Sequence, residues 1–297
     1  MPNRELVFYL NPTGPDRRKI MRLLAEAGIR RIGIDGCPWK PGQADREIAA
    51  FHKDLKEFGL TVYSMHAIPC LVATAGPDAP QDLMDSLLAD LRRLAAMGGK
   101  TAVYHACMMR NVVPEKVDEA IAEVGWDVFV KRYAIMVKFV AQEAAKHDIT
   151  VVLENIWQSE HSRSVKGFLP IVEAAAEPNV GVILDSGHAH LCGLSIADEI
   201  RAAGKHLRDT HFHDNIGLID GQFIDQHIPP GLGTINWQAA CKALNEIAFP
   251  GPIVFEGVLG PGDSIEKGRF GGKLSHKDLI AITIANWRAF EAMGEKA

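Results

Sequence analysis

The sequence predicts an α/β protein, a (β/α)8 TIM barrel whose single domain spans residues 1–297. Two observations carry this prediction. Short runs rich in β-branched and aromatic residues alternate eight times with longer amphipathic patterns. No linker, low-complexity tract or break in composition divides the chain. Eight strand–helix units joined by parallel crossovers close most economically into a barrel.

The expected strands are short apolar runs that end near a polar residue. They cover 5–10, 31–36, 61–66, 101–106, 150–155, 180–185, 207–214 and 252–257. A doubly wound open sheet is the alternative fold. It is disfavoured because the GxGxxG turn with which such sheets bind dinucleotides does not follow the first run.

The expected helices follow the strands and repeat apolar residues at three- and four-residue spacing. Several of these patterns stop at a glycine shortly before the next strand, the usual C-terminal signal of a helix. They cover 16–28, 45–59, 82–98, 128–148, 165–177, 195–204, 236–248 and 276–294.

Composition excludes several classes of protein. A chain with 47% hydrophobic and 23% charged residues has ample material for a globular core. The net charge of −5 indicates neither nucleic-acid nor membrane binding. Five cysteines without a CxxC pair are typical of reduced thiols. The first residues lack the apolar region of a signal peptide, so the expected location is cytoplasmic.

Metal-binding residue types recur where the expected strands end. In (β/α)8 barrels these strand ends and the loops after them carry the functional groups. One strand-end histidine is more often a hydrogen-bonded barrel residue, and an acid there can cap the next turn. The same event at consecutive strands instead favours one shared site. The residues are His66, His105, Glu154, Asp185, His188, His211, His213, Asp225, His227 and Glu256.

Several acids at one point require a cation. A carboxylate buried beside apolar strand residues costs several kcal/mol unless it is paired or coordinated, and neighbouring carboxylates repel one another. Mixed histidine and carboxylate ligands suit zinc, manganese, cobalt or iron better than calcium. Residues 186–190, just after Asp185, are small and glycine-containing, so the sequence does not predict an ordinary helix there.

Five motifs in the second half of the chain resemble the xylose isomerase-like barrels (AP endonuclease family 2). This superfamily includes sugar isomerases and epimerases such as D-tagatose 3-epimerase, inosose dehydratases and endonuclease IV. The resemblance is strongest over 150–257 and weaker, but in register, over 1–110. The motifs are LENIW, VILDSGHAH, HFHDN, DQHIPPGLGTINW and IVFEG.

The resemblance implies a ligand set and a substrate contact. Epimerase-like members hold one metal ion with residues that match Glu154, Asp185, His211 and Glu256. His211 and His213 share a strand face, and the family's acid three residues after the ligand selects His211. His188 matches a histidine that contacts the substrate.

The implied activity is that of a divalent-metal-dependent isomerase or epimerase acting on a ketose or sugar phosphate. The metal would stabilise an enediolate, while Glu154 and Glu256 would remove and return the proton as the catalytic pair. The expected cofactor is Mn²⁺, with Mg²⁺, Co²⁺ or Zn²⁺ as alternatives. The expected partner is a small-molecule sugar, and a homo-oligomer is possible.

Three alternatives stay open. A metal-dependent dehydratase of a keto-sugar or keto-inositol begins with the same proton abstraction. An endonuclease IV-like zinc phosphodiesterase would use His66, His105, Asp225 and His227 as further ligands, but the acidic chain disfavours DNA binding. A sugar-binding barrel without activity would leave the two glutamates without a purpose.

The walls of the pocket are expected to come from the strand ends and their loops. In sugar-acting members, residues matching His66 and His105 line the substrate pocket, and His227 lies in the family's closing loop, where Gly231 and Gly233 would allow positive φ. Trp157 could present an apolar face to a sugar or pack in the barrel. The glycine-rich stretch 257–275 is either a surface loop or a lid whose Arg269 contacts the distal end of the substrate.

Overall fold

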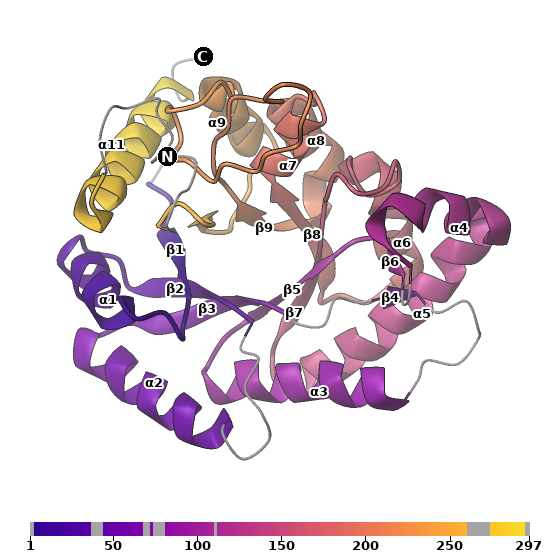
Figure 1. Ribbon diagram of the computed structural model, residues 1–297, viewed down its shortest axis with the longest axis horizontal. Helices are drawn as coiled ribbons and strands as arrows, with labels where there is room; N and C mark the ends of the chain where they lie inside the picture. Colours follow the sequence, from indigo (N-terminus) through magenta and orange to yellow (C-terminus); the bar gives the residue numbers. More distant parts are fainter. Residues whose placement is uncertain are drawn as a thin grey trace.

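The computed structural model describes residues 3–36, 44–67, 72–73, 81–109, 112–259 and 274–294. It shows eight parallel strands in one sheet, in the order β10-β1-β2-β3-β5-β7-β8-β9 (Figure 1). Every strand lies inside a predicted range, so the TIM barrel is confirmed. A single domain over the whole chain stays a prediction. The strands are β1 (Leu6–Leu10), β2 (Arg31–Asp35), β3 (Thr61–His66), β5 (Thr101–His105), β7 (Thr150–Glu154), β8 (Val180–Asp185), β9 (Leu207–His211) and β10 (Ile253–Phe255).

The barrel closes between its last two strands. Phe212, directly after β9, forms a parallel bridge with Phe255 of β10. The N–H of Phe212 donates to the carbonyl of Val254 at 2.8 Å, and the N–H of Val254 donates to Oγ1 of Thr210 at 3.0 Å. Since β10 also pairs with β1, these few bonds bring the ends of all eight strands around one axis.

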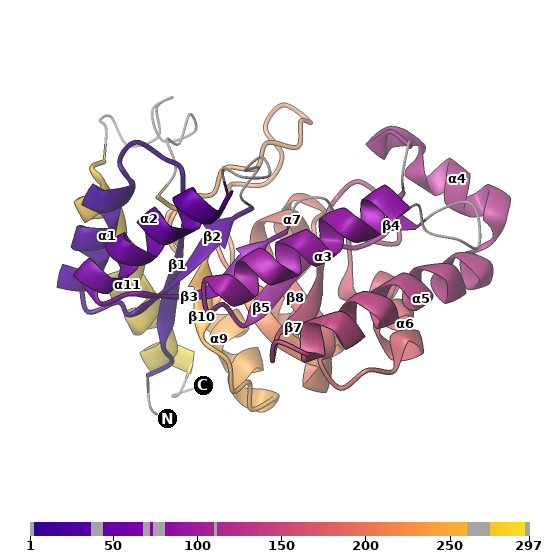
Figure 2. The ribbon, with the colours of Figure 1, turned by 90° about the horizontal axis from the view of Figure 1, so that it is seen from below.

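The helices surround the sheet (Figure 1; Figure 2). Each predicted helix has a counterpart, and the additional α4, the short helices η1, α7 and η2, and a small sheet of β4 (Val72–Ala73) and β6 (Met108–Met109) were not predicted. None of the described helices combines the length and apolar character that a membrane crossing requires. The helices are α1 (Arg17–Glu26), α2 (Ala44–Phe58), α3 (Gln81–Ala96), η1 (Pro114–Lys116), α4 (Val117–Val124), α5 (Trp126–Ala145), α6 (Val165–Ala175), α7 (Ser186–Leu191), α8 (Ile196–Ala203), η2 (Gly204–His206), α9 (Trp237–Glu246) and α11 (His276–Gly294).

The short helix α7 corrects the expectation for the segment after Asp185. Asp185 is its N-cap, and its Oδ1 accepts a hydrogen bond from the N–H of His188 at 2.7 Å. A side chain on Gly187 would overlap the imidazole of His213. The glycine therefore serves close packing and does not interrupt the helix.

An aromatic cluster covers the closing seam from outside. Trp287 of α11 packs 5.7 Å from Phe255 and 5.6 Å from Phe212, measured between ring centroids. Trp237 of α9 lies 5.3 Å from Phe212 and 5.7 Å from Trp287. All four rings are buried at 1% exposure or less. Burial of these large apolar surfaces holds the two helices against the seam, where backbone pairing is sparse.

Inside the barrel, one close approach limits the choice of residue. Tyr9 of β1 lies across Gly33 of the neighbouring β2, and any Cβ at Gly33 would overlap the Tyr9 ring. Tyr9 packs with Val7, Tyr63 and Val254, and its ring edge meets the His211 ring at a centroid distance of 4.8 Å. The interior packing is thus continuous with the end of β9.

We expect Gly33→Ala to destabilise the protein by about 1–3 kcal/mol, the usual cost of overpacking a filled interior. The free energy of unfolding in urea measures the loss. In a Tyr9→Val background the same substitution should cost much less, because the overlapping ring is gone. An equal loss of unfolding free energy in the two backgrounds would contradict the close contact between Gly33 and the Tyr9 ring.

Candidate metal centre

Four predicted ligands converge at the C-terminal end of the barrel. Glu154 ends β7, Asp185 ends β8, His211 ends β9 and Glu256 follows β10. One potential ligand atom from each lies within 4.8 Å of the others. The first three side chains are fully buried, and Glu256 retains 12% exposure.

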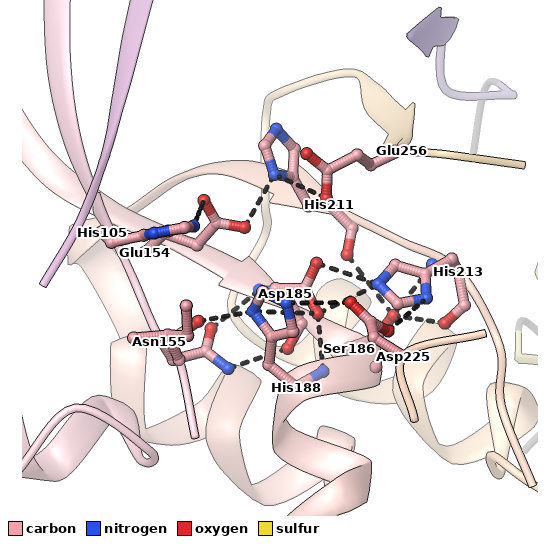
Figure 3. A network of polar contacts seen from close by, with 12 residues as sticks. His105, Glu154, Asn155, Asp185, Ser186, His188, His211, His213, Asp225 and Glu256 are labelled. Atoms are coloured by element: carbon pink, nitrogen blue, oxygen red, sulfur yellow. Dashed lines mark hydrogen bonds and ion pairs between the residues drawn. The ribbon is translucent and has the colours of Figure 1, made fainter. Parts of the chain in front are cut away.

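The imidazole of His211 lies at the centre of this group. Figure 3 shows the two glutamates reaching the same ring nitrogen from two sides. His211 Nδ1 is 2.8 Å from Glu154 Oε1 and 3.3 Å from Glu256 Oε2. His211 Nε2 is buried and makes no hydrogen bond to any described residue, whereas the buried Glu154 Oε2 faces His66.

This donor set fits a divalent cation. Within the four-residue group three carboxylates share one imidazole, so protonation of His211 alone offsets only part of their negative charge. Mutual repulsion and desolvation would otherwise oppose such an arrangement. One imidazole with three carboxylates is the mixture of ligands that zinc, manganese and related ions accept. That these four residues are the ligands stays a prediction.

Charges within the four-residue group shift the pKa values of Glu154 and His211 more than burial does. Burial alone would raise the pKa of Glu154, but the charge of His211 and its hydrogen bond hold that pKa well below its usual value. Burial opposes protonation of His211, yet Glu256 and Glu154 raise the pKa of His211 well above its usual value. Without a cation, a proton on His211 therefore stabilises the cluster.

Two further histidines lie beside the outer oxygen of Glu154. His66 Nε2 is 3.2 Å and His105 Nε2 is 3.7 Å from Glu154 Oε2, and these two nitrogens are 3.1 Å apart. Burial and the neighbouring charge of His66 lower the pKa of His105 to about 3. The three residues form a second group that could hold a metal ion. The position of His66 and His105 fits both predictions made for them. They could line the sugar pocket, or they could be further ligands of an endonuclease IV-like zinc site.

A third such group comes from the loop between β9 and α9. His213, Asp225 and His227 offer ligand atoms within the same reach. Asp225 Oδ2 is 3.4 Å from His227 Nε2 and 3.1 Å from His188 Nε2, and the rings of His213 and His227 stack at 4.0 Å. Burial opposes protonation, but Asp185 and Asp225 raise the pKa of His188 to about 10. His188 also contacts the carbonyl of Asn155 through Nδ1 at 2.8 Å.

His211 and His213 make different contacts in the structure. His211 joins the four-residue group, whereas His213 Nε2 lies 3.0 Å from Asp185 Oδ2. The hydroxyl of Ser186 fixes the backbone of His213 by accepting from its N–H at 3.0 Å and donating to its carbonyl at 2.7 Å. His213 therefore supports Asp185, a contact that the sequence did not predict.

Asp214 organises the loop that carries Asp225 and His227. Its buried carboxylate accepts hydrogen bonds at 2.8–3.1 Å from four donors: the N–H groups of Asn215, Gly231 and Ile235 and the indole N–H of Trp237. Gly231 has the predicted positive φ of 87°. The prediction for Gly233 was wrong: this glycine is needed because a Cβ would overlap Asp214.

Trp157 lies at the mouth of the site and not in the barrel packing. Its ring meets His188 edge-on at 4.7 Å and stacks with Phe223 of the β9–α9 loop at 6.5 Å. Phe223 is 48% exposed, so this aromatic pair borders solvent. Arg269 and the rest of the proposed lid lie outside the described residues.

Sequence reasoning missed two acids near the site. Asp35 ends β2 in register with His66. Its side chain is exposed, but partial loss of hydration beside the site and the charge of Glu256 raise its pKa. The strand-end rule that selected the other acids applies to Asp35 equally. Asp209 lies inside β9, where burial raises its pKa to about 7 and His211 is close enough to counteract that shift. The sequence signal for Asp209 was its position two residues before His211, which places both side chains on the same face of the strand.

Comparison with known proteins identifies the family. A family model described as "Xylose isomerase-like TIM barrel" matches residues 21–269. The chain belongs to this family. An inosose isomerase of Bacillus velezensis is 36% identical over 80 residues, which are 27% of this chain and 29% of that protein.

Solved structures show the same fold over nearly the whole chain. A D-psicose 3-epimerase of Clostridium cellulolyticum H10, crystallised with D-tagatose, has a TM-score of 0.69 at 18% identity and covers 97% of this chain and 99% of its own. The IolI protein with a bound zinc atom has a TM-score of 0.70 at 17% identity, with coverages of 97% and 98%. At these identities the likeness establishes the fold.

Metal affinity should rise with pH between about 6 and 8, by roughly tenfold per pH unit for one displaced proton. The reason is that His211, with its raised pKa, holds a proton that a cation must displace, whereas Glu154 and Glu256 are already ionised. Competition with a chromogenic chelator at each pH measures the affinity. A metal affinity that does not change with pH over this range would contradict displacement of a His211 proton by the cation.

Proposed function

We propose that the protein is a divalent-metal-dependent isomerase or epimerase that acts on a ketose or a related keto-sugar. The observation that carries the proposal is the pair of glutamates around His211. Glu154 belongs to β7 and Glu256 follows β10, and β8 and β9 lie between these strands in the barrel. Two carboxylates therefore reach one reaction centre from different directions.

Glu154, Asp185, His211 and Glu256 would hold the cation. When bound, a divalent cation would withdraw electron density from the carbonyl oxygen and the neighbouring hydroxyl of a sugar, which acidifies the C–H bond of the carbon that bears that hydroxyl. Mn²⁺ is the ion we expect, and the zinc in the IolI structure keeps Zn²⁺ as an alternative.

The two glutamates would then move the proton. One carboxylate would remove the proton from the carbon next to the carbonyl. The other, which is ionised in the resting site and must first take up a proton from water, would return that proton to the substrate. Return to the opposite face of the same carbon gives the epimer, and return to the adjacent carbon gives the isomer. Substrate and product have the same composition, so no redox partner is required.

The surrounding side chains suit a polyhydroxylated substrate. His66 and His105 lie next to Glu154, and His227 Nε2 lies 3.7 Å from Glu256 Oε2. These imidazoles would hydrogen-bond to sugar hydroxyls. His188, which is protonated between Asn155 and Asp225, would act toward the substrate as a donor only. The face of Trp157 would pack on the C–H groups of the substrate. Names among the similar proteins, which include 3-epimerases and inosose isomerases, support this substrate class. The cytoplasm as its compartment stays a prediction.

Proton abstraction can be detected without knowing the product. The Mn²⁺-loaded protein should incorporate deuterium from D₂O next to the carbonyl of at least one sugar in a panel of D-fructose, D-tagatose, D-psicose, L-ribulose and 2-keto-myo-inositol. Proton NMR measures the exchange, and mass spectrometry detects loss of water, the sign of a dehydratase. Exchange should stop with a chelator and return with Mn²⁺.

Glu154→Gln and Glu256→Gln should each lower the exchange rate at least about a hundredfold, the scale for losing a general base. Metal content should fall less than the rate. Glu246→Gln, an exposed glutamate of α9 paired with Arg201, is the matched control and should leave the rate unchanged. Substantial exchange in both site variants would rule out the two-glutamate mechanism.

A zinc phosphodiesterase is the second candidate, favoured by the three adjoining ligand groups. Two-metal sites that cleave phosphodiesters place their ions close together. Metal analysis separates the two functions: we expect exchange activity to saturate at one bound ion per chain. Three tightly bound zinc ions, together with cleavage of a DNA duplex that contains an abasic site, would instead establish the phosphodiesterase.

A further inference from the structure

A second polar layer lies inside the barrel beneath the four-residue metal group. Asp209 of β9 is fully buried and pairs in register with Ile183 of β8. Ile183 packs with Val103 and Val152 in the interior of the barrel. Register partners on parallel strands point the same way, so Asp209 points toward the barrel axis. His211, two residues later, lies on the same face in the layer above.

Asp209 and His211 each have one buried polar atom without a hydrogen-bond partner among the described residues. Asp209 Oδ1 accepts a hydrogen bond from the N–H of Thr210 at 2.8 Å, but its Oδ2 is buried and makes no hydrogen bond to the described residues. His211 turns Nδ1 to Glu154 and Glu256, so its other ring nitrogen, Nε2, faces away from them. That nitrogen is also buried and without a hydrogen bond to the described residues.

Two buried hydroxyls lie beside Asp209 and His211. Tyr9 lies edge-on to His211, and Ser64, Asp209 and His211 are its polar neighbours. The hydroxyls of Tyr9 and Ser64 are buried in this layer, but neither carries charge. A central strand position disfavours aspartate, so a fully buried acid at this place needs a specific partner.

We infer that Asp209 is a positioning residue for His211 and accepts the Nε2–H of His211 through one buried water. A histidine that binds a metal almost always donates its second N–H to a carboxylate, a carbonyl or a water, and this bond fixes the tautomer and the ring. Here it leaves the lone pair on Nδ1, the atom that faces the metal group. The inference rests on the metal site of the proposed function and not on its sugar chemistry.

Metal affinity tests the inference directly. Asp209→Asn and Asp209→Ala should each weaken Co²⁺ and Zn²⁺ binding by about 10- to 100-fold, the usual effect of losing such a partner. Competition with a chromogenic chelator measures the affinity. The visible spectrum of bound Co²⁺ should also change, which a merely structural role would not cause. Asp90→Asn is the control, because Asp90 is a buried acid on α3 paired with Arg93 at 2.8 Å. It should leave both readouts unchanged.

A measurement on the unmodified side chain covers variants that fail to fold. In Zn²⁺-loaded wild-type protein with ¹⁵N-labelled histidine, His211 Nε2 should carry a proton that exchanges slowly with water, and Nδ1 should carry none. His211→Gln assigns the signals. A zinc-bound Nε2, or a protonated Nδ1, would overturn the inference.

The outcomes separate the two proposals. If wild-type protein binds no divalent metal, the metal site of the proposed function fails. If wild-type protein binds metal, and folded Asp209 variants bind it within twofold of wild type with the same Co²⁺ spectrum, only the role of Asp209 is overturned. Weakened binding in the Asp209 variants but not in Asp90→Asn supports the role.

Discussion

The arrangement of this protein depends on holding three carboxylates around one imidazole out of water. Glu154, Asp185 and Glu256 repel one another, and burial alone makes each charge costly. His211 relieves part of that cost, as the opposite pKa shifts of His211 and the two glutamates show. His188 and His227, whose pKa values are raised to about 10 and about 9, relieve more of it, and a divalent cation would relieve the rest. The cluster is typical of a metal site, and repulsion among its carboxylates is the interaction that a bound cation would relieve.

The barrel supplies the rigidity that this repulsion requires. The ligand positions end β7, β8 and β9 or follow β10, so parallel pairing sets their spacing. At the weakest point of the sheet, between β9 and β10, Trp237 and Trp287 cover the seam. Trp237 also donates to Asp214, which ties the loop bearing Asp225 and His227 to the same cluster. Trp237 therefore both covers the seam between β9 and β10 and helps to hold the loop that carries the third ligand group.

The sequence predicted the strands and the convergence of their polar ends, because parallel strands must end on one side of the sheet. The residues alone left His211 and His213 open, and only the family resemblance selected His211. The sequence could not show that His213 supports Asp185, since that contact depends on Ser186 and on the space left at Gly187. The helix α7 was missed because capping by Asp185 outweighs low helix propensity. Asp209 was missed because only strand ends were searched for functional acids, although its two-residue spacing from His211 places both on one strand face.

Crystals grown with Mn²⁺ and measured at the manganese absorption edge test the central claim most directly. An anomalous peak coordinated by Glu154, Asp185, His211 through Nδ1 and Glu256 is the result that the charge arrangement predicts. A peak held by other residues, or no peak at saturating Mn²⁺ while the four side chains keep these positions, would contradict it.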